Sequence, residues 1–122
     1  MNQDTTIPVL DTDDLMDRCL SNAEFAQRIL SRFQERCVED LASLEEAVQA
    51  GKVDEAVTLA HRIKGAAGNA SASSMRAVAA EIEETARQGS LNLVSPMLHS
   101  LQREWTQFQV AAARFGPATP SE

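Results

Sequence analysis

Two residues of one short segment could do chemistry together. His61 and Lys64 lie three residues apart within TLAHRIKGAAGNAS, residues 58–71, and on a helix this spacing projects both side chains from the same side. A neutral imidazole has an ordinary pKa near 6.5 and offers a nucleophilic nitrogen at neutral pH. An ammonium beside it can stabilise charge on transferring phosphoryl oxygens. The pair therefore fits the transfer of a phosphoryl group onto His61.

The helix expected over residues 53–70 turns His61 away from the core. At about 100° per residue, the apolar positions of this helix gather on the side opposite the histidine. These positions are Ala56, Leu59, Ala60, Ile63, Ala66, Ala67 and Ala70. A buried structural histidine would lie among them, so we predict that His61 is exposed.

The residues beside His61 carry little bulk. Thr58, Gly65 and Gly68 share its face of the helix, and Arg62 adjoins it. Each glycine inside a helix costs roughly 1 kcal/mol relative to alanine, and neither glycine faces the core. We predict that these four residues form a docking surface, cleared so that another protein can reach the imidazole.

Apolar periodicity predicts five helices along the chain. A short one covers residues 11–20, with aspartates in its first turn. The second opens at a capping box, Ser21 with Glu24, and stops at Gly51. The third covers 53–70, the fourth follows N-cap candidates at 71–74, and Gly89 closes it. The fifth starts at Ser95-Pro96, or already at 91–94, and ends at Gly116-Pro117.

Four long amphipathic helices with short connections predict an all-α fold, an antiparallel four-helix bundle with an additional short N-terminal capping helix. We expect an N-terminal arm at residues 1–10, of which Ile7, Val9 and Leu10 could dock, the bundle at 11–116 and a flexible tail at 117–122. At 122 residues the chain is large enough for one core. The initiating Met1 and the loose tail favour a free-standing chain over a piece of a larger protein.

Composition argues against several classes of partner. A net charge of −7 would repel nucleic acid and acidic membrane surfaces. No signal peptide is visible, and no run approaches the roughly 20 apolar residues that span a bilayer. Cys19 and Cys37 have no metal-site or CxxC spacing, so both are expected to be reduced and semi-buried. We expect a cytoplasmic monomer.

Other reactive side chains suggest no second site. His99 is expected to be solvent-exposed, and Glu81, Glu83 and Glu84 to form a solvated face. Di-iron Glu-x-x-His pairs, a haem Cys-x-x-Cys-His motif and a glycine-rich phosphate loop do not occur. The chain is therefore expected to have no cofactor or metal of its own and no ATP-dependent kinase activity. Arg62 and Arg76 could add positive charge near His61 or be ordinary surface charge.

AHRIKGAAGNAS resembles the signature of histidine-containing phosphotransfer (HPt) domains of phosphorelays. His61, Lys64, Gly65, Ala66 and Ala67 match, whereas Ser71 stands where the family usually has glycine. We expect this serine to be a helix N-cap. The resemblance implies a four-helix bundle, His61 as phospho-acceptor and donor, and Lys64 as electrostatic support. It also implies partners: response-regulator receiver domains, which supply Mg²⁺, and a hybrid sensor histidine kinase.

Three functions remain open at this point. The first is a phosphocarrier that accepts a phosphoryl group from a receiver aspartyl-phosphate on His61 and passes it to another receiver. The second is a helical docking or scaffold module that transfers nothing, which would need neither His61 nor Lys64. The third is a kinase-linked domain whose His61 is phosphorylated directly by an ATP-binding partner.

Overall fold

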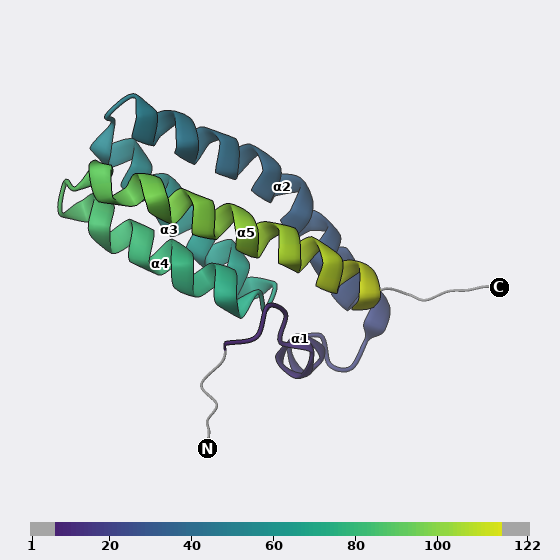
Figure 1. The fold of residues 1–122 in the computed structure, drawn as a ribbon. Coiled ribbons are helices and arrows are strands. Elements are labelled where there is room, and N and C mark those ends of the chain that lie inside the picture. The colour runs from purple at the N-terminus through teal and green to yellow at the C-terminus, as the bar shows by residue number, and fades with distance from the viewer. Residues whose placement is uncertain (1–6, 116–122) are drawn as a thin grey trace, which may run out of the picture.

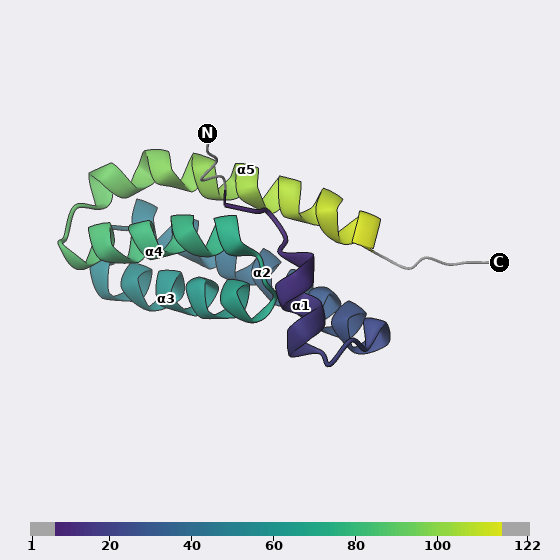
Figure 2. The same cartoon turned by 90° about the horizontal axis from the view of Figure 1, so that it is seen from below.

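The computed structural model describes residues 7–115, and these form five helices and no strand (Figure 1). They are α1 (Thr12–Arg18), α2 (Ala23–Gln49), α3 (Val53–Asn69), α4 (Ser73–Arg87) and α5 (Leu91–Phe115). The last four run alternately up and down, and α1 lies across one end of the bundle (Figures 1 and 2). The predicted four-helix bundle with a short N-terminal helix is confirmed. The predicted tail and most of the predicted arm, residues 1–6, lie outside the described part of the chain.

Short polar side chains start the first two helices. Asp11 caps α1 by accepting a hydrogen bond from the Asp14 amide, and Asn22 caps α2 by accepting one from the Phe25 amide. The predicted capping box of Ser21 and Glu24 is therefore wrong: Ser21 lies in the preceding turn with φ +63°.

Of the two predicted starts of the fifth helix, Ser95-Pro96 and residues 91–94, the earlier one is correct. α5 begins at Leu91 and contains Pro96 in its second turn. Gly89, at φ +83°, makes the turn that precedes it.

The core lies between the four long helices. Phe33 of α2 packs edge-on against Phe108 and Trp105 of α5, with ring centroids 5.0 and 6.2 Å apart. The predicted core face of α3 is buried apart from Ala66, which is half-buried. Its alanines, with Ala79 and Ala86 of α4, let α3 and α4 lie closely side by side (Figure 2).

The turn between α3 and α4 holds α1 in place. Ser71 is buried at φ +58°, a conformation that favours glycine. Its carbonyl accepts a hydrogen bond from the Asp11 amide (2.9 Å), and its hydroxyl donates one to Oδ2 of Asp14 (2.7 Å). The expectation that Ser71 is an N-cap is therefore wrong, since α4 begins at Ser73 with Ala72 before it.

The described end of the N-terminal arm, residues 7–10, packs partly against the bundle. Val9 and Leu10 pack against the core, and the Pro8 carbonyl accepts a hydrogen bond from the Ser74 amide (3.0 Å). Ile7 stays half exposed.

Both cysteines are free and more fully buried than expected. Burial, followed by the nearby Asp40 carboxylate, raises the pKa of the Cys37 thiol to about 12. Within residues 7–115, no helix is long and apolar enough to cross a membrane.

Candidate functional site

His61 lies on the solvent side of α3, as its register predicts. Its side chain is 67% exposed, and the residues opposite it on the helix form the core face. The ring is not free on both sides, because its Nδ1 lies 3.0 Å from Oε2 of Glu83 on α4. The helix packing that brings α4 beside α3 therefore gives the imidazole a carboxylate partner.

Glu83 is the centre of an ion-pair cluster. Its side chain is only 5% exposed, and the Arg87 guanidinium one turn further along α4 donates a hydrogen bond to Oε2 at 2.8 Å. The Lys64 Nζ lies 2.8 Å from Oε1 and forms an ion pair with it. Lys64 and His61 thus approach one carboxylate from the same side of α3.

The burial of Glu83 corrects the expectation that Glu81, Glu83 and Glu84 form a solvated face. Glu81 and Glu84 lie on an exposed face as predicted, but Glu83 does not. It stands next to Ile82 and four residues after Ala79, at the edge of the buried stripe of α4. This position, beside the apolar stripe of the helix, was the sequence signal that could have predicted the burial of Glu83.

The cluster keeps Glu83 ionised. The Lys64 ammonium is the largest cause, Arg87 and His61 add to it, and burial opposes them; together they lower the pKa of Glu83 from 4.5 to about 2. An ionised carboxylate only accepts hydrogen bonds. The neutral His61 imidazole must therefore carry its proton on Nδ1, which leaves the Nε2 lone pair bare.

The predicted docking surface is open at one glycine and partly covered at the other. An added Cβ at Gly65 would meet nothing within 4 Å, whereas one at Gly68 would lie 3.3 Å from Cδ and Nε of Arg76. Gly68 is therefore not bare, because the Arg76 side chain from α4 lies over it. Thr58 is exposed.

Arg62 points toward α2 rather than toward the imidazole. Its Nη1 lies 3.2 Å from Oδ1 of Asp40, and the rest of its side chain stays half exposed. Its charge is thus partly neutralised.

His99 is exposed on α5, as expected, and lines a separate pocket with Leu41, Glu45 and Leu98. The structure does not bring it to His61. Within residues 7–115, no three His, Cys, Asp or Glu side chains converge in a way that could hold a metal ion.

Comparison with known proteins identifies the family of this chain. The family model described as Hpt domain matches residues 28–111, which include α3, α4 and most of α2 and α5. The chain belongs to the Hpt family. Its members carry out histidine phosphotransfer in phosphorelays.

One solved structure resembles this Hpt chain along most of its length. It is histidine-containing phosphotransfer protein B (HptB) from Pseudomonas aeruginosa PAO1, at 27% identity and a TM-score of 0.82, covering 89% of this chain and 95% of that one. No curated protein matches the sequence.

Proposed function

We propose that this Hpt chain is a phosphorelay carrier whose phosphorylated atom is Nε2 of His61. In this proposal the phosphoryl group arrives from the aspartyl-phosphate of a receiver domain and leaves to the aspartate of another. The observation that carries the proposal is the exposed His61 ring whose Nδ1 is held by the buried, ionised Glu83. A scaffold would need neither feature.

The transfer step requires no base on this chain. The Nε2 lone pair attacks phosphorus, the N–P bond forms, and the P–O bond to the receiver aspartate breaks, releasing it as a carboxylate. Nε2 has no proton to lose, because the proton is on Nδ1. The ring becomes a phosphoimidazolium, and its positive charge lies beside the Glu83 carboxylate, which stabilises it. The reverse step regenerates the neutral ring.

The two cations beside Glu83 have distinct positions. Arg87 contacts the same oxygen as His61, so it orients the carboxylate. Lys64 lies on the other oxygen and is 29% exposed. From there its ammonium can also reach phosphoryl oxygens on the ring. In this proposal the Mg²⁺ comes from the receiver's acidic pocket.

Label transfer tests the proposal. The chain is incubated with phosphorylated receiver domains, and uptake of acid-labile, base-stable label is compared between the native chain, His61→Gln and His99→Gln. We expect His61→Gln to take up no label and His99→Gln to match the native chain. Label on His61→Gln would refute the assignment, and receivers that never label the native chain would favour the scaffold. Label that arrives only from a kinase with ATP would favour direct phosphorylation by that kinase.

A further inference from the structure

Two adjoining pockets follow the seam between α2 and α5, on the side of the bundle away from His61. Their volumes are about 240 and 200 Å³, and Leu41, Glu45 and Gln102 line both of them. In the bundle α2 packs against α3, and α5 packs against α4. The His61 ring lies toward α4, where it contacts Glu83. The seam is therefore separate from the surface around the imidazole.

Apolar side chains of the seam are accessible from solvent. Val38 is 57% exposed, and Leu41 and Leu98 are half-buried. Trp105 is the most deeply buried of the residues that line the smaller pocket, which Val38 borders from α2. Aromatic side chains are enriched at the centres of protein interfaces. An indole at the base of an apolar pocket fits such a centre.

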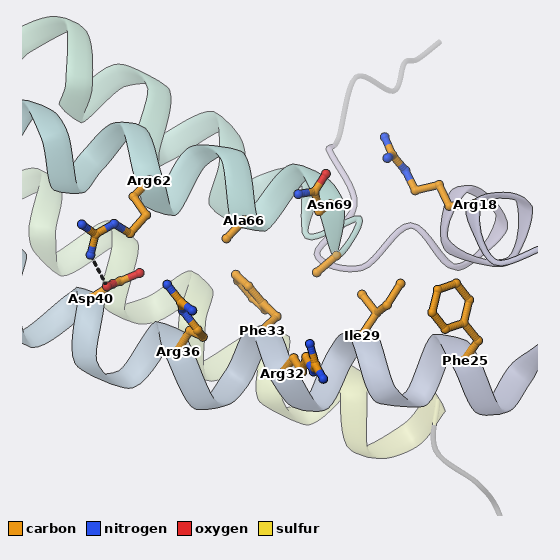
Figure 3. A pocket seen from close by; sticks show the side chains of 11 residues that line it. Arg18, Phe25, Ile29, Arg32, Phe33, Arg36, Asp40, Arg62, Ala66 and Asn69 are labelled. Carbon is orange, nitrogen blue, oxygen red and sulfur yellow. Dashed lines mark hydrogen bonds and ion pairs between the residues drawn. The ribbon is translucent and has the colours of Figure 1, made fainter.

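The seam carries little charge, although 24% of the chain is charged. Glu45 is the one Asp, Glu, Lys or Arg residue that lines either pocket. The groove between α2 and α3 differs, because arginines from three helices and Asp40 line it (Figure 3). Depletion of charged residues marks the core of an interface. At helical spacing the uncharged face continues beyond the pockets, through Gln27, Ser31, Gln34, Thr106 and Gln109.

An uncharged face of this size suits a second copy of the chain. Each copy has a net charge of −7, so two copies repel each other least where the seam of one meets the seam of the other. From Gln27 to Gln49 the seam is about 33 Å long, and two helices are about 20 Å wide. A face of about 660 Å² approaches the roughly 800 Å² that each partner buries in a standard interface. These dimensions predict a weak, concentration-dependent dimer.

The two helices of the seam complement each other at equal heights. α2 and α5 run antiparallel (Figure 1). At one level Val38 of α2 lies across the smaller pocket from Gln102 and Trp105, and at another Glu45 lies across the larger pocket from His99. A half-turn about an axis parallel to the helices keeps these levels and places α2 of one copy on α5 of the other. Every contact then forms twice, as in other twofold dimers.

We propose that the seam between α2 and α5 binds a second copy of this chain, with α2 of each copy packed on α5 of the other. Val38 of each copy enters the smaller pocket of the other, near Trp105. The Glu45 carboxylate accepts a hydrogen bond from the ring N–H of His99 of the second copy. Both His61 rings stay open on the outer sides, so the dimer presents two transfer sites. This dimer takes the place of the monomer expected from the sequence.

Sedimentation equilibrium of the native chain tests the association. From about 10 μM to about 1 mM at neutral pH, we expect the mass to rise from the 13.3 kDa of one chain toward twice that value. Raising NaCl from about 0.05 M to about 0.5 M should lower the dimer Kd, because salt screens the repulsion between two negative chains. The mass of one chain at every concentration would overturn the proposal, and so would a dimer that weakens with salt.

A charge placed in the seam provides the decisive variant. Val38→Glu puts a carboxylate at an apolar contact that forms twice in the dimer, so we expect Kd to rise at least tenfold. Leu93→Glu is the matched control, since it adds the same charge at a residue that is 54% exposed. Leu93 lies nine residues before Gln102 and thus on the opposite side of α5. Leu93→Glu should dimerise as the native chain does, and equal Kd values for Val38→Glu and the native chain would overturn the proposal.

Cross-linking tests the arrangement of the two copies. A chain with Val38→Cys is mixed with a chain with Gln102→Cys under mild oxidation. Each carries one exposed thiol, because Cys19 and Cys37 are buried. We expect disulfide-linked dimers in the mixture and few with either variant alone. If Val38→Cys cross-links to itself as readily, α2 packs on α2 and the proposed arrangement is wrong.

The association is independent of phosphotransfer. His61→Gln should dimerise with the native Kd. Val38→Glu should take up label as fast as the native chain at concentrations where both are monomeric. A native chain that dimerises but takes up no label would therefore refute the proposed function alone, and a labelled chain that never dimerises would refute this inference alone.

Discussion

Nδ1 of His61 on α3 lies 3.0 Å from Oε2 of Glu83 on α4, so an exposed ring rests against a buried carboxylate from the neighbouring helix. This contact determines which ring nitrogen carries the proton. It also connects an accessible imidazole to Lys64 and Arg87, which share the carboxylate.

Replacing the Glu83 carboxylate by an amide should remove the preference of the His61 ring for the Nδ1–H tautomer. Glu83→Gln keeps the shape of the side chain but removes the charge that favours Nδ1–H. Hydrogen bonds to charged groups contribute about 1.5–3 kcal/mol, so we expect transfer to His61 to slow by about 10- to 100-fold. ¹⁵N shifts of the imidazole should show a mixture of tautomers, where the native chain shows Nδ1–H. A native tautomer with a native rate would reduce Glu83 to a structural residue.

Lys64 should act on the phosphoryl group more than on the ring. Lys64→Ala leaves Arg87 and Oε2 of Glu83 in place, so the Nδ1–H tautomer should persist in ¹⁵N spectra. Single-turnover transfer should nevertheless slow by about tenfold, with His61 still the labelled residue, because a cation near the phosphoryl oxygens is lost. Lys64→Arg should recover part of the rate. If the tautomer changes in step with the rate, Lys64 acts only by holding Glu83.

The two glycines of α3 should respond differently to an added methyl group. At Gly65 the methyl has open space, so Gly65→Ala should raise the free energy of unfolding by up to about 1 kcal/mol while weakening receiver binding. At Gly68 it would lie 3.3 Å from Arg76, which must shift, so Gly68→Ala should gain less. Denaturant melts and transfer assays on both variants check this. Loss of stability at Gly65 would contradict a cleared surface.

The ion-pair cluster should make stability depend on pH in acid. The folded-state pKa of Glu83 is about 2 against an ordinary 4.5, so its contribution is complete above pH 4.5 and is lost as the pH falls toward 2. Urea melts of the native chain should therefore show unfolding free energy decreasing through this range. Glu83→Gln should show a shallower slope there, and Glu81→Gln, a change at an exposed position, should keep the native slope. Equal slopes for all three would mean that Glu83 is not held ionised in the folded chain.

The sequence by itself determined the helices, the core face of α3 and the outward direction of His61. These follow from local periodicity, because a residue's position around a helix depends only on its spacing from the apolar positions. The place of Lys64 on the same side as His61 followed for the same reason.

Tertiary structure alone decided what lies behind the imidazole. Glu83 is 22 residues from His61, and only the close packing of α4 on α3 brings them together and makes that acidic residue buried rather than solvated. The same packing laid Arg76 over Gly68.

The backbone conformation of Ser71 also depends on tertiary structure. Its positive φ follows from a turn that joins α3 to α4 and also bonds the start of α1. The bonds are to Asp11 and Asp14, which lie 60 and 57 residues earlier in the sequence. Spacing along one helix carries no information about such contacts, since they depend on how separate helices pack against each other.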